Sequence, residues 1–167
     1  TGIDCHIGSQ LTDLSPLADA ADRVLALVDS LSAEGITLDH IDLGGGFGIR
    51  YRDETPAPIA QFVDGALGVL AGRTETLILD PGRAIVGNAG VLLARVEYVK
   101  HGAERNFLVV DAAMNDLIRP ALYGAWQDVL PVRQPDASAA TTLYDIVGPV
   151  CESADFLAKE RALAARA

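Results

Sequence analysis

Residues 42–48 spell Asp-Leu-Gly-Gly-Gly-Phe-Gly, and they follow directly on an apolar run at 38–43 that predicts a β-strand. Consecutive glycines let the backbone approach an anion closely and turn its N–H groups toward it. A glycine triplet also occurs in ordinary tight turns, so the interpretation depends on its neighbours. The dinucleotide-binding fingerprint is a poor match, because the G-x-G-x-x-G spacing is absent and no helix is predicted directly after Gly48.

Strand and helix signals alternate on both sides of this turn. A strand is predicted at 2–7, a helix at 14–34, a second helix at 58–70 and a further strand at 76–79. This β-α-β-α-β order predicts an α/β fold with parallel strands and right-handed crossovers. The apolar positions of the first helix share one face: Leu14, Leu17, Ala21, Leu25, Val28 and Leu31.

The first helix carries recognisable end signals. Ser15 is predicted as its N-cap with Pro16 as the first helical residue, and Gly35 is predicted to end it. The strand at 76–79 is apolar on both faces, which is typical of a parallel strand buried between helices. Three parallel strands by themselves would leave open edges and an uncovered apolar face, which favours association.

The second half of the chain has a different character. Strands are predicted at 91–100, 107–111 and 141–147, separated by turn-rich stretches. The alanine-rich tail at 154–167 predicts a helix. We therefore expect a mainly antiparallel β-region, with its boundary to the first half near the glycines at 87–90.

Charge and cysteine content exclude several function classes. The chain has 13 Lys and Arg residues against 23 Asp and Glu residues, a formal net charge of −10, which argues against nucleic acid and anionic lipid as partners. No apolar run approaches the roughly 20 residues of a membrane-spanning helix. The only cysteines, Cys5 and Cys151, are too few for a disulfide scaffold or a four-cysteine zinc site, so we expect a cytoplasmic protein without a metal.

Each predicted strand of the first half ends in a polar or glycine-rich cluster. These clusters lie at 6–10, 42–48 and 80–83, and the carboxyl ends of parallel strands meet at one edge of a sheet. The Ser9 hydroxyl and the forked Arg83 guanidinium suit a phosphate group. His6 can stack on an aromatic ring and Asp80 can pair with a ring N–H. Taken alone, a histidine such as His6 is more often a core residue, and Asp80 before Pro81 is also compatible with the start of a turn.

The second half adds candidates for substrate contacts. Arg119 suits a carboxylate, Tyr123 supplies a hydroxyl, Cys151 is a thiol proton donor and Glu152 is a carboxylate that suits an amine. Taken alone, an arginine such as Arg119 is more often a surface or interface ion-pair residue, and a glutamate such as Glu152 is more often a solvated charge.

These clusters carry a resemblance to a known family. The chain resembles the diaminopimelate decarboxylases, which are fold-type III decarboxylases dependent on pyridoxal 5'-phosphate, in five segments that occur in order: His6-Ile7-Gly8-Ser9-Gln10, Asp42-Leu43-Gly44-Gly45-Gly46, Asp80-Pro81-Gly82-Arg83, Asn115-Asp116-Leu117-Ile118-Arg119-Pro120-Ala121-Leu122-Tyr123 and Cys151-Glu152-Ser153.

The resemblance assigns a role to each of these residues. His6 would stack on the cofactor ring, Asp80 would face the pyridine nitrogen and Cys151 would donate the proton, so these three are the catalytic candidates. The residues that would contact the cofactor are His6, Ser9, Gly44, Gly45, Gly46, Asp80, Gly82 and Arg83. The residues that would bind the substrate are Arg83, Arg119, Tyr123 and Glu152.

The resemblance also implies a fold and a reaction. Residues 1–88 would be the later part of a (β/α)8 TIM-type barrel that binds the cofactor phosphate, and residues 89–167 would be part of a mainly antiparallel β-domain. The reaction would remove carbon dioxide from meso-2,6-diaminopimelate to give L-lysine, the last step of bacterial lysine synthesis. In the family the cysteine and glutamate come from the partner subunit, which implies a homodimer with the site at its interface.

Two differences from the family pattern stand out. Family members hold the cofactor through a Schiff base to a lysine on an early barrel strand, and neither Lys100 nor Lys159, the only lysines, matches that position. Asp80 stands where the family has the longer glutamate. The resemblance therefore implies a fragment, inactive by itself, that lacks the N-terminal barrel strands and the extreme C-terminal β-domain.

Two alternatives remain open on the sequence. One is a decarboxylase of the same family that acts on ornithine, arginine or carboxynorspermidine; the segment Cys151-Glu152-Ser153 favours diaminopimelate, because the glutamate suits a distal group that carries both an amine and a carboxylate. The other is a non-catalytic fold or assembly module related to these decarboxylases, which the missing lysine and Asp80 would explain.

Overall fold

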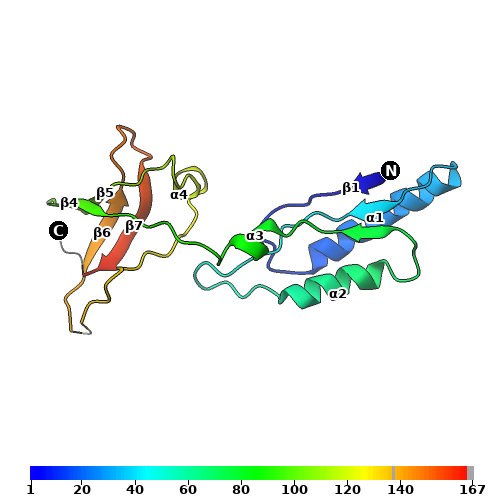
Figure 1. The fold of residues 1–167 in the computed structure, drawn as a ribbon, viewed down its shortest axis with the longest axis horizontal. Coiled ribbons are helices and arrows are strands. Elements are labelled where there is room, and N and C mark those ends of the chain that lie inside the picture. The colour runs from blue at the N-terminus through cyan, green and yellow to red at the C-terminus, as the bar shows by residue number, and fades with distance from the viewer. Residues whose placement is uncertain (137, 165–167) are drawn as a thin grey trace. The chain divides into compact units, whose positions relative to one another are not determined.

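The computed structural model describes residues 1–136 and 138–164, and the chain divides into two compact units, Thr1–Val91 and Leu92–Ala167 (Figure 1). The first unit contains, in order, β1 (Gly2–Asp4), α1 (Ser15–Ala33), β2 (His40–Asp42), α2 (Ile59–Val69), β3 (Thr76–Ile78) and α3 (Gly82–Val86). Its three strands form a parallel sheet in the order β1-β2-β3, which confirms the predicted α/β alternation.

The start of α1 differs by one residue from the prediction. Leu14 is the N-cap and Ser15 is already helical, so Ser15 as the N-cap was wrong. The reason is Asp13, whose carboxylate accepts a hydrogen bond from the backbone N–H of Ser15 at 2.9 Å and so satisfies one of the free amides of the first turn. The end is as predicted, because Gly35 follows the C-cap with a φ of +84°.

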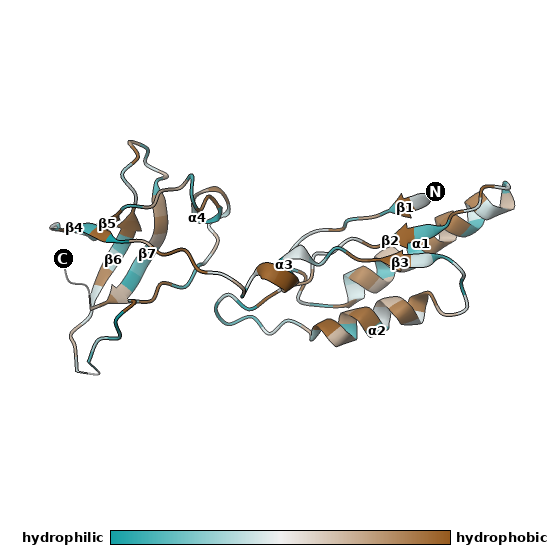
Figure 2. Ribbon diagram, in the orientation of Figure 1, coloured by the Kyte–Doolittle hydropathy of each residue, from teal (hydrophilic) through white to brown (hydrophobic). Residues whose placement is uncertain are grey.

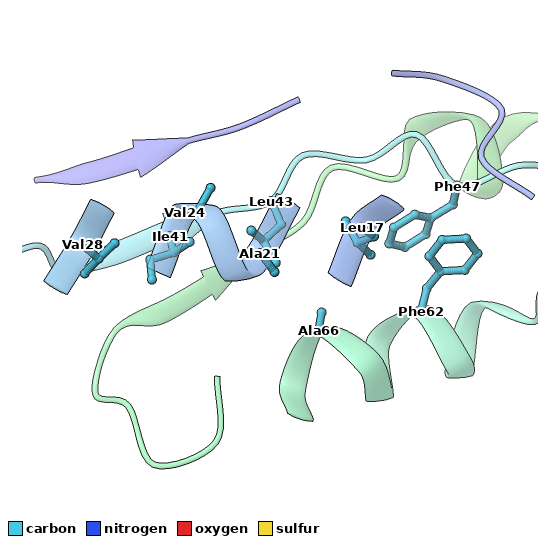
Figure 3. Packing of buried hydrophobic residues seen from close by; sticks show 9 residues of the cluster. All are labelled: Leu17, Ala21, Val24, Val28, Ile41, Leu43, Phe47, Phe62 and Ala66. Carbon is cyan, nitrogen blue, oxygen red and sulfur yellow. The ribbon is translucent and has the colours of Figure 1, made fainter. Parts of the chain in front are cut away.

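The apolar stripes of α1 and α2 pack on one face of the sheet (Figures 2 and 3). Figure 3 shows Phe47 against Phe62, and their rings stack at a centroid distance of 4.4 Å. Burial of each large apolar side chain contributes about 1.5–3 kcal/mol. The buried residues of this core are Leu17, Ala21, Val24, Val28, Ile41, Leu43, Phe47, Phe62 and Ala66.

The opposite face of this sheet is more polar than predicted. Ile3, Ile41 and Leu77 pack on the helical side, so the alternate positions in register point away from it. Those positions are Gly2, Asp4, His40, Asp42, Thr76 and Ile78, of which only Ile78 is a large apolar residue. The expected uncovered apolar face was therefore wrong, because strands as short as these alternate in character.

The second unit is a four-stranded mixed sheet. Its elements are β4 (Val96–His101), β5 (Asn106–Val110), α4 (Arg119–Tyr123), β6 (Thr142–Val147) and β7 (Phe156–Leu163). The order is β4-β5-β6-β7, with antiparallel pairs at both ends and a parallel pair, β5 with β6, in the middle. The mainly antiparallel β-region is thus confirmed, with one parallel pair that the sequence did not reveal.

The predicted C-terminal helix was wrong. Residues 156–163 form β7, which pairs with β6, and the predicted helix residues 165–167 lie outside the described residues. Leu157 and Ala158 are buried against Leu108 and Ile146 in the core of the second unit. Burial and pairing across the sheet outweigh the weak helix preference of alanine.

In the described part of the chain, none of the helices has both the length and the apolar character that crossing a membrane would require.

Candidate functional site

The three strand ends of the first unit meet through backbone hydrogen bonds. The N–H of Asp80 donates to the carbonyl of Gly44 at 3.1 Å, which joins the end of β3 to the glycine turn after β2. The N–H of Leu11 donates to the carbonyl of Gly46 at 2.8 Å, which joins the segment after β1 to the same turn. The predicted convergence of the clusters at 6–10, 42–48 and 80–83 is therefore present.

Glycine is required at this meeting point. Gly44 and Gly46 have φ values of +69° and +80°, which favour glycine strongly. A Cβ on Gly45 would overlap the carbonyl oxygen of Asp80, and one on Gly46 would overlap the carbonyl oxygen of Gly8. Among the described residues, the N–H groups of Gly45 and Gly46 donate no hydrogen bond to other parts of the chain, so they are available to an anion.

Arg83 lies in α3 with its guanidinium directed at the segment that follows β1. Its Nη2 donates to Oγ of Ser9 at 2.8 Å and its Nη1 donates to Oε1 of Gln10 at 3.0 Å. The guanidinium carbon is also 5.9 Å from the centroid of the Tyr51 ring, within the range of a cation–π contact. The phosphate-binding pair expected from sequence, Ser9 and Arg83, is thus in direct contact.

Gln10 is a residue that sequence reasoning missed. Its Nε2 donates to the carbonyl of Ile49 at 2.6 Å, and its Oε1 accepts from the N–H of Ile49 at 3.2 Å as well as from Arg83. The residue has a φ of +63°, a conformation that is uncommon outside glycine. Gln10 therefore links Arg83 to the chain just beyond the glycine turn; the only sequence signal was its position directly after Ser9.

His6, Asp80 and Gly82 border the same turn. A Cβ on Gly44 would come 3.0 Å from Nδ1 of His6, so the imidazole lies against the turn, where it is exposed rather than buried in the core. The Asp80 carboxylate is exposed and lies next to Gly45. Gly82 is the first residue of α3, and its N–H donates to the carbonyl of Asp80 at 2.7 Å.

Arg119 and Tyr123 lie at the two ends of the short helix α4 in the second unit. The Arg119 guanidinium carbon is 5.1 Å from the centroid of the Tyr123 ring, and the Tyr123 side chain is exposed. Among the described residues, the buried Nε of Arg119 has no hydrogen-bond partner. This arginine therefore has donor capacity left for a ligand carboxylate.

Cys151 and Glu152 lie on an exposed turn between β6 and β7. Oε1 of Glu152 accepts hydrogen bonds at 3.1 Å from the N–H of Ala154 and from Oγ of Ser153. These two bonds, that of Ala154 first, lower the pKa of Glu152 below its usual value. Glu152 is therefore negatively charged at neutral pH and suits a substrate ammonium group.

An open groove of about 420 Å³ lies beside this turn on the second unit. Its floor is the face of the sheet that carries Phe107 and Phe156, and Lys100 and Lys159 line it. Glu152 borders the groove, but Cys151 and Arg119 do not line it. The groove therefore does not bring the predicted substrate residues together.

The chain matches a family model and several characterised proteins. Residues 10–167 match the model described as the pyridoxal-dependent decarboxylase, C-terminal sheet domain. Diaminopimelate decarboxylases from Pseudomonas aeruginosa and Pseudomonas fluorescens are 59% and 61% identical to it over 163 residues, which is 98% of this chain but 39% of each relative. This chain thus spans about two fifths of the length of these relatives.

Solved structures give the same result. The crystal structure of diaminopimelate decarboxylase from Helicobacter pylori complexed with L-lysine superposes with a TM-score of 0.87 at 39% sequence identity, covering 97% of this chain and 40% of that one. Since the family model spans nearly the whole chain, the chain belongs to the pyridoxal-dependent decarboxylase family.

Proposed function

We propose that the whole protein to which this chain belongs removes carbon dioxide from meso-2,6-diaminopimelate to give L-lysine, as a decarboxylase dependent on pyridoxal 5'-phosphate. The observation that carries the proposal is the convergence of three strand ends on the paired Ser9 and Arg83, in a chain that belongs to this decarboxylase family. In this proposal residues 1–88 are part of an α/β barrel and residues 89–167 are part of the β-domain.

The residues of the first unit fit the cofactor phosphate. Among the described residues, the N–H groups of Gly45 and Gly46 donate to no other part of the chain, and the Arg83 guanidinium lies beside the Ser9 hydroxyl. Backbone amides, a hydroxyl and a forked cation are the donors that phosphate oxygens accept best. We assign Gly44, Gly45, Gly46 and Gly82 to this phosphate site together with Ser9 and Arg83.

The remaining residues suit the chemistry of decarboxylation. When bound, pyridoxal phosphate supplies an electron sink for the electron pair left by the departing carboxylate. The Asp80 carboxylate would hold a proton on the ring nitrogen, because a neighbouring negative charge favours the protonated form. His6 would support the flat face of the ring. The Cys151 thiol would return a proton to the reacting carbon.

Substrate recognition is assigned to charged groups of matching sign. Arg119 and Arg83 would bind carboxylates, Tyr123 would add a hydroxyl and the charged Glu152 would bind the distal ammonium group. The exposure of Cys151 and Glu152 on their turn supports a homodimer in which they serve the partner's site. Both cysteines are free thiols, which supports a cytoplasmic location.

The experiment uses the whole polypeptide, loaded with pyridoxal phosphate and supplied with meso-diaminopimelate. Release of L-lysine and carbon dioxide in equal amounts is expected. Ornithine, arginine and carboxynorspermidine are tested as competitors, and turnover of one of these in preference to diaminopimelate would move the proposal to the first alternative. A well-folded, cofactor-loaded protein that turns over none of the four would contradict the decarboxylase proposal.

The second alternative, a non-catalytic assembly module, rests on the positions of the two lysines. Both lie in the second unit, Lys100 on β4 and Lys159 on β7, and neither lies in the unit that holds the phosphate cluster. A module of this kind would form stable dimers by gel filtration and show no visible absorbance change on titration with pyridoxal phosphate.

A further inference from the structure

Asp155 is a buried acid for which the proposed chemistry has no use. The residue precedes β7 and is 4% exposed. One carboxylate oxygen accepts a hydrogen bond from the N–H of Met114 at 2.7 Å, and the other accepts from the N–H of Val150, also at 2.7 Å. A buried carboxylate is costly unless it is fully hydrogen-bonded, so these two bonds are a strong constraint on the local structure.

The two donors belong to the two segments that carry the second-unit site residues. Val150 directly precedes Cys151 and Glu152 on the exposed turn. Met114 lies in a turn that leads into α4: the N–H of Leu117 donates to the carbonyl of Ala113 at 3.2 Å, and α4 begins at Arg119. A single side chain is therefore bonded to both segments.

Gly148 shows how closely the two segments approach this carboxylate. A Cβ placed on Gly148 would come 2.5 Å from Oδ2 of Asp155 and 2.7 Å from the carbonyl oxygen of Ala112. The N–H of Gly148 also donates to the backbone carbonyl of Asp155 at 3.2 Å. There is no room for a methyl group at Gly148. The segment that contains Gly148 therefore packs directly against both the Asp155 carboxylate and the backbone of Ala112.

The arrangement requires a carboxylate. Both N–H groups need an acceptor, and only a carboxylate offers two acceptor oxygens in this space. Asparagine would keep one acceptor and point an NH₂ group at the other N–H, which leaves a buried donor without a partner. An isosteric Asp155→Asn change is therefore a sharp probe, because it alters the hydrogen bonding and leaves the shape unchanged.

We propose that Asp155 is a positioning residue that holds the Cys151–Glu152 turn at a fixed distance from the segment leading to Arg119 and Tyr123. This inference rests on the proposed function, in which these four residues contact the substrate. Asp155 does not touch the substrate; it acts through the backbone at Met114 and Val150.

The first test measures, in the whole protein, how well the backbone amides of the two segments are protected from exchange. Hydrogen–deuterium exchange followed by mass spectrometry compares the wild type with Asp155→Asn. Peptides that cover 113–117 and 148–152 should exchange faster in the variant, while peptides from β5 and β6 stay unchanged. Unchanged protection of both segments in the variant would overturn the proposal, whether or not the protein is a decarboxylase.

The second test measures catalysis. In Asp155→Asn, kcat for diaminopimelate should fall by about a hundredfold, the loss expected for small misplacement of reacting groups, and KM should rise. The affinity for pyridoxal phosphate, read from its visible absorbance, should stay unchanged because the phosphate cluster lies in the first unit. Gly148→Ala should reproduce this pattern, since its Cβ would push on the same carboxylate.

Asp145→Asn is the matched control. Asp145 is the other buried aspartate of the sheet, at 6% exposed, and it accepts a hydrogen bond from the N–H of Glu160 at 2.8 Å rather than from either segment. This variant should lose stability but retain wild-type kcat. Equal loss of kcat in Asp145→Asn and Asp155→Asn would show a general weakening of the sheet and overturn the proposal. Absence of decarboxylation in the wild type would instead contradict the proposed function.

Discussion

In the first unit the candidate residues are held by hydrogen bonds to one another. In the second unit they lie on an exposed turn and a short helix, and the buried Asp155 carboxylate accepts hydrogen bonds from the backbone next to both. Ser9 and Gln10 bond Arg83 directly, and the glycine turn is fixed by the buried ring of Phe47. Cys151 and Glu152 are exposed and depend on Asp155. The candidate residues of the first unit are therefore held by side-chain contacts, and those of the second unit by a bond to their backbone.

The largest expected effect comes from removing the anchor of the glycine turn. Phe47 is 1% exposed and stacks on Phe62, so Phe47→Ala should lower the free energy of unfolding by about 3–5 kcal/mol. Urea denaturation followed by circular dichroism measures the loss. Leu67→Ala, at a 53% exposed position of α2, is the control and should cost far less. Equal losses in the two variants would show that the turn is not anchored by Phe47.

The next effect concerns the phosphate site itself. Arg83→Ala removes the forked cation and should weaken binding of pyridoxal phosphate about a hundredfold, while Arg83→Lys keeps the charge without the fork and should cost about tenfold. Fluorescence or absorbance titration of the whole protein gives both values. The control is Arg23→Ala on α1, an exposed arginine that should bind the cofactor as the wild type does. If the three variants bound equally well, Arg83 would not contact the phosphate.

A smaller effect is expected from the residue that supports Arg83. Gln10→Ala removes one hydrogen bond to Arg83 and two to Ile49, and the loss of one such bond costs about 1 kcal/mol, or roughly fivefold in affinity. Cofactor titration should show this weakening. Gln61→Ala, an exposed glutamine of α2, is the matched control. Full affinity in Gln10→Ala would indicate that Ser9 alone is sufficient to orient the guanidinium.

The smallest effect is on the charge of Glu152. Hydrogen bonds from Ala154 and Ser153 lower its pKa below the ordinary value of a glutamate, so folding favours the charged form. The resulting stabilisation is complete above the unfolded pKa and is lost as the pH falls through the lower, folded value. Ser153→Ala should raise the pKa of Glu152, as measured by NMR titration of its carboxyl carbon. Ser138→Ala, an exposed serine of the same unit, should leave it unchanged, and an equal shift in both variants would contradict this assignment.

The sequence predicted the first unit well because its signals are local. The spacing of apolar residues in α1, the glycine turn and the polar strand ends follow from short stretches of chain, and the parallel strand order places the clusters together. The convergence of the clusters that hold Ser9 and Arg83 followed from that order, although these two residues are 74 positions apart. The end of the chain was mispredicted, because its alanine-rich composition does not reveal the pairing of β7 with β6.

Gln10 and Asp155 were missed for the same physical reason. Each acts on backbone groups about 40 residues away, Ile49 for Gln10 and Met114 for Asp155, and a pattern within a short window carries no signal of such a bond. Both follow immediately or closely on residues that the sequence did single out. Polar residues adjacent to a recognised motif therefore merit inspection as supports of that motif.

The proposed phosphate site of the first unit can be tested with two forms of vitamin B6 that differ only in the phosphate group. The whole protein is titrated with pyridoxal phosphate and with pyridoxal, in the wild type and in Arg83→Ala. The wild type should prefer the phosphorylated ligand by about a hundredfold, and the variant should lose this preference. Equal affinity of the wild type for both ligands would contradict the proposed phosphate site.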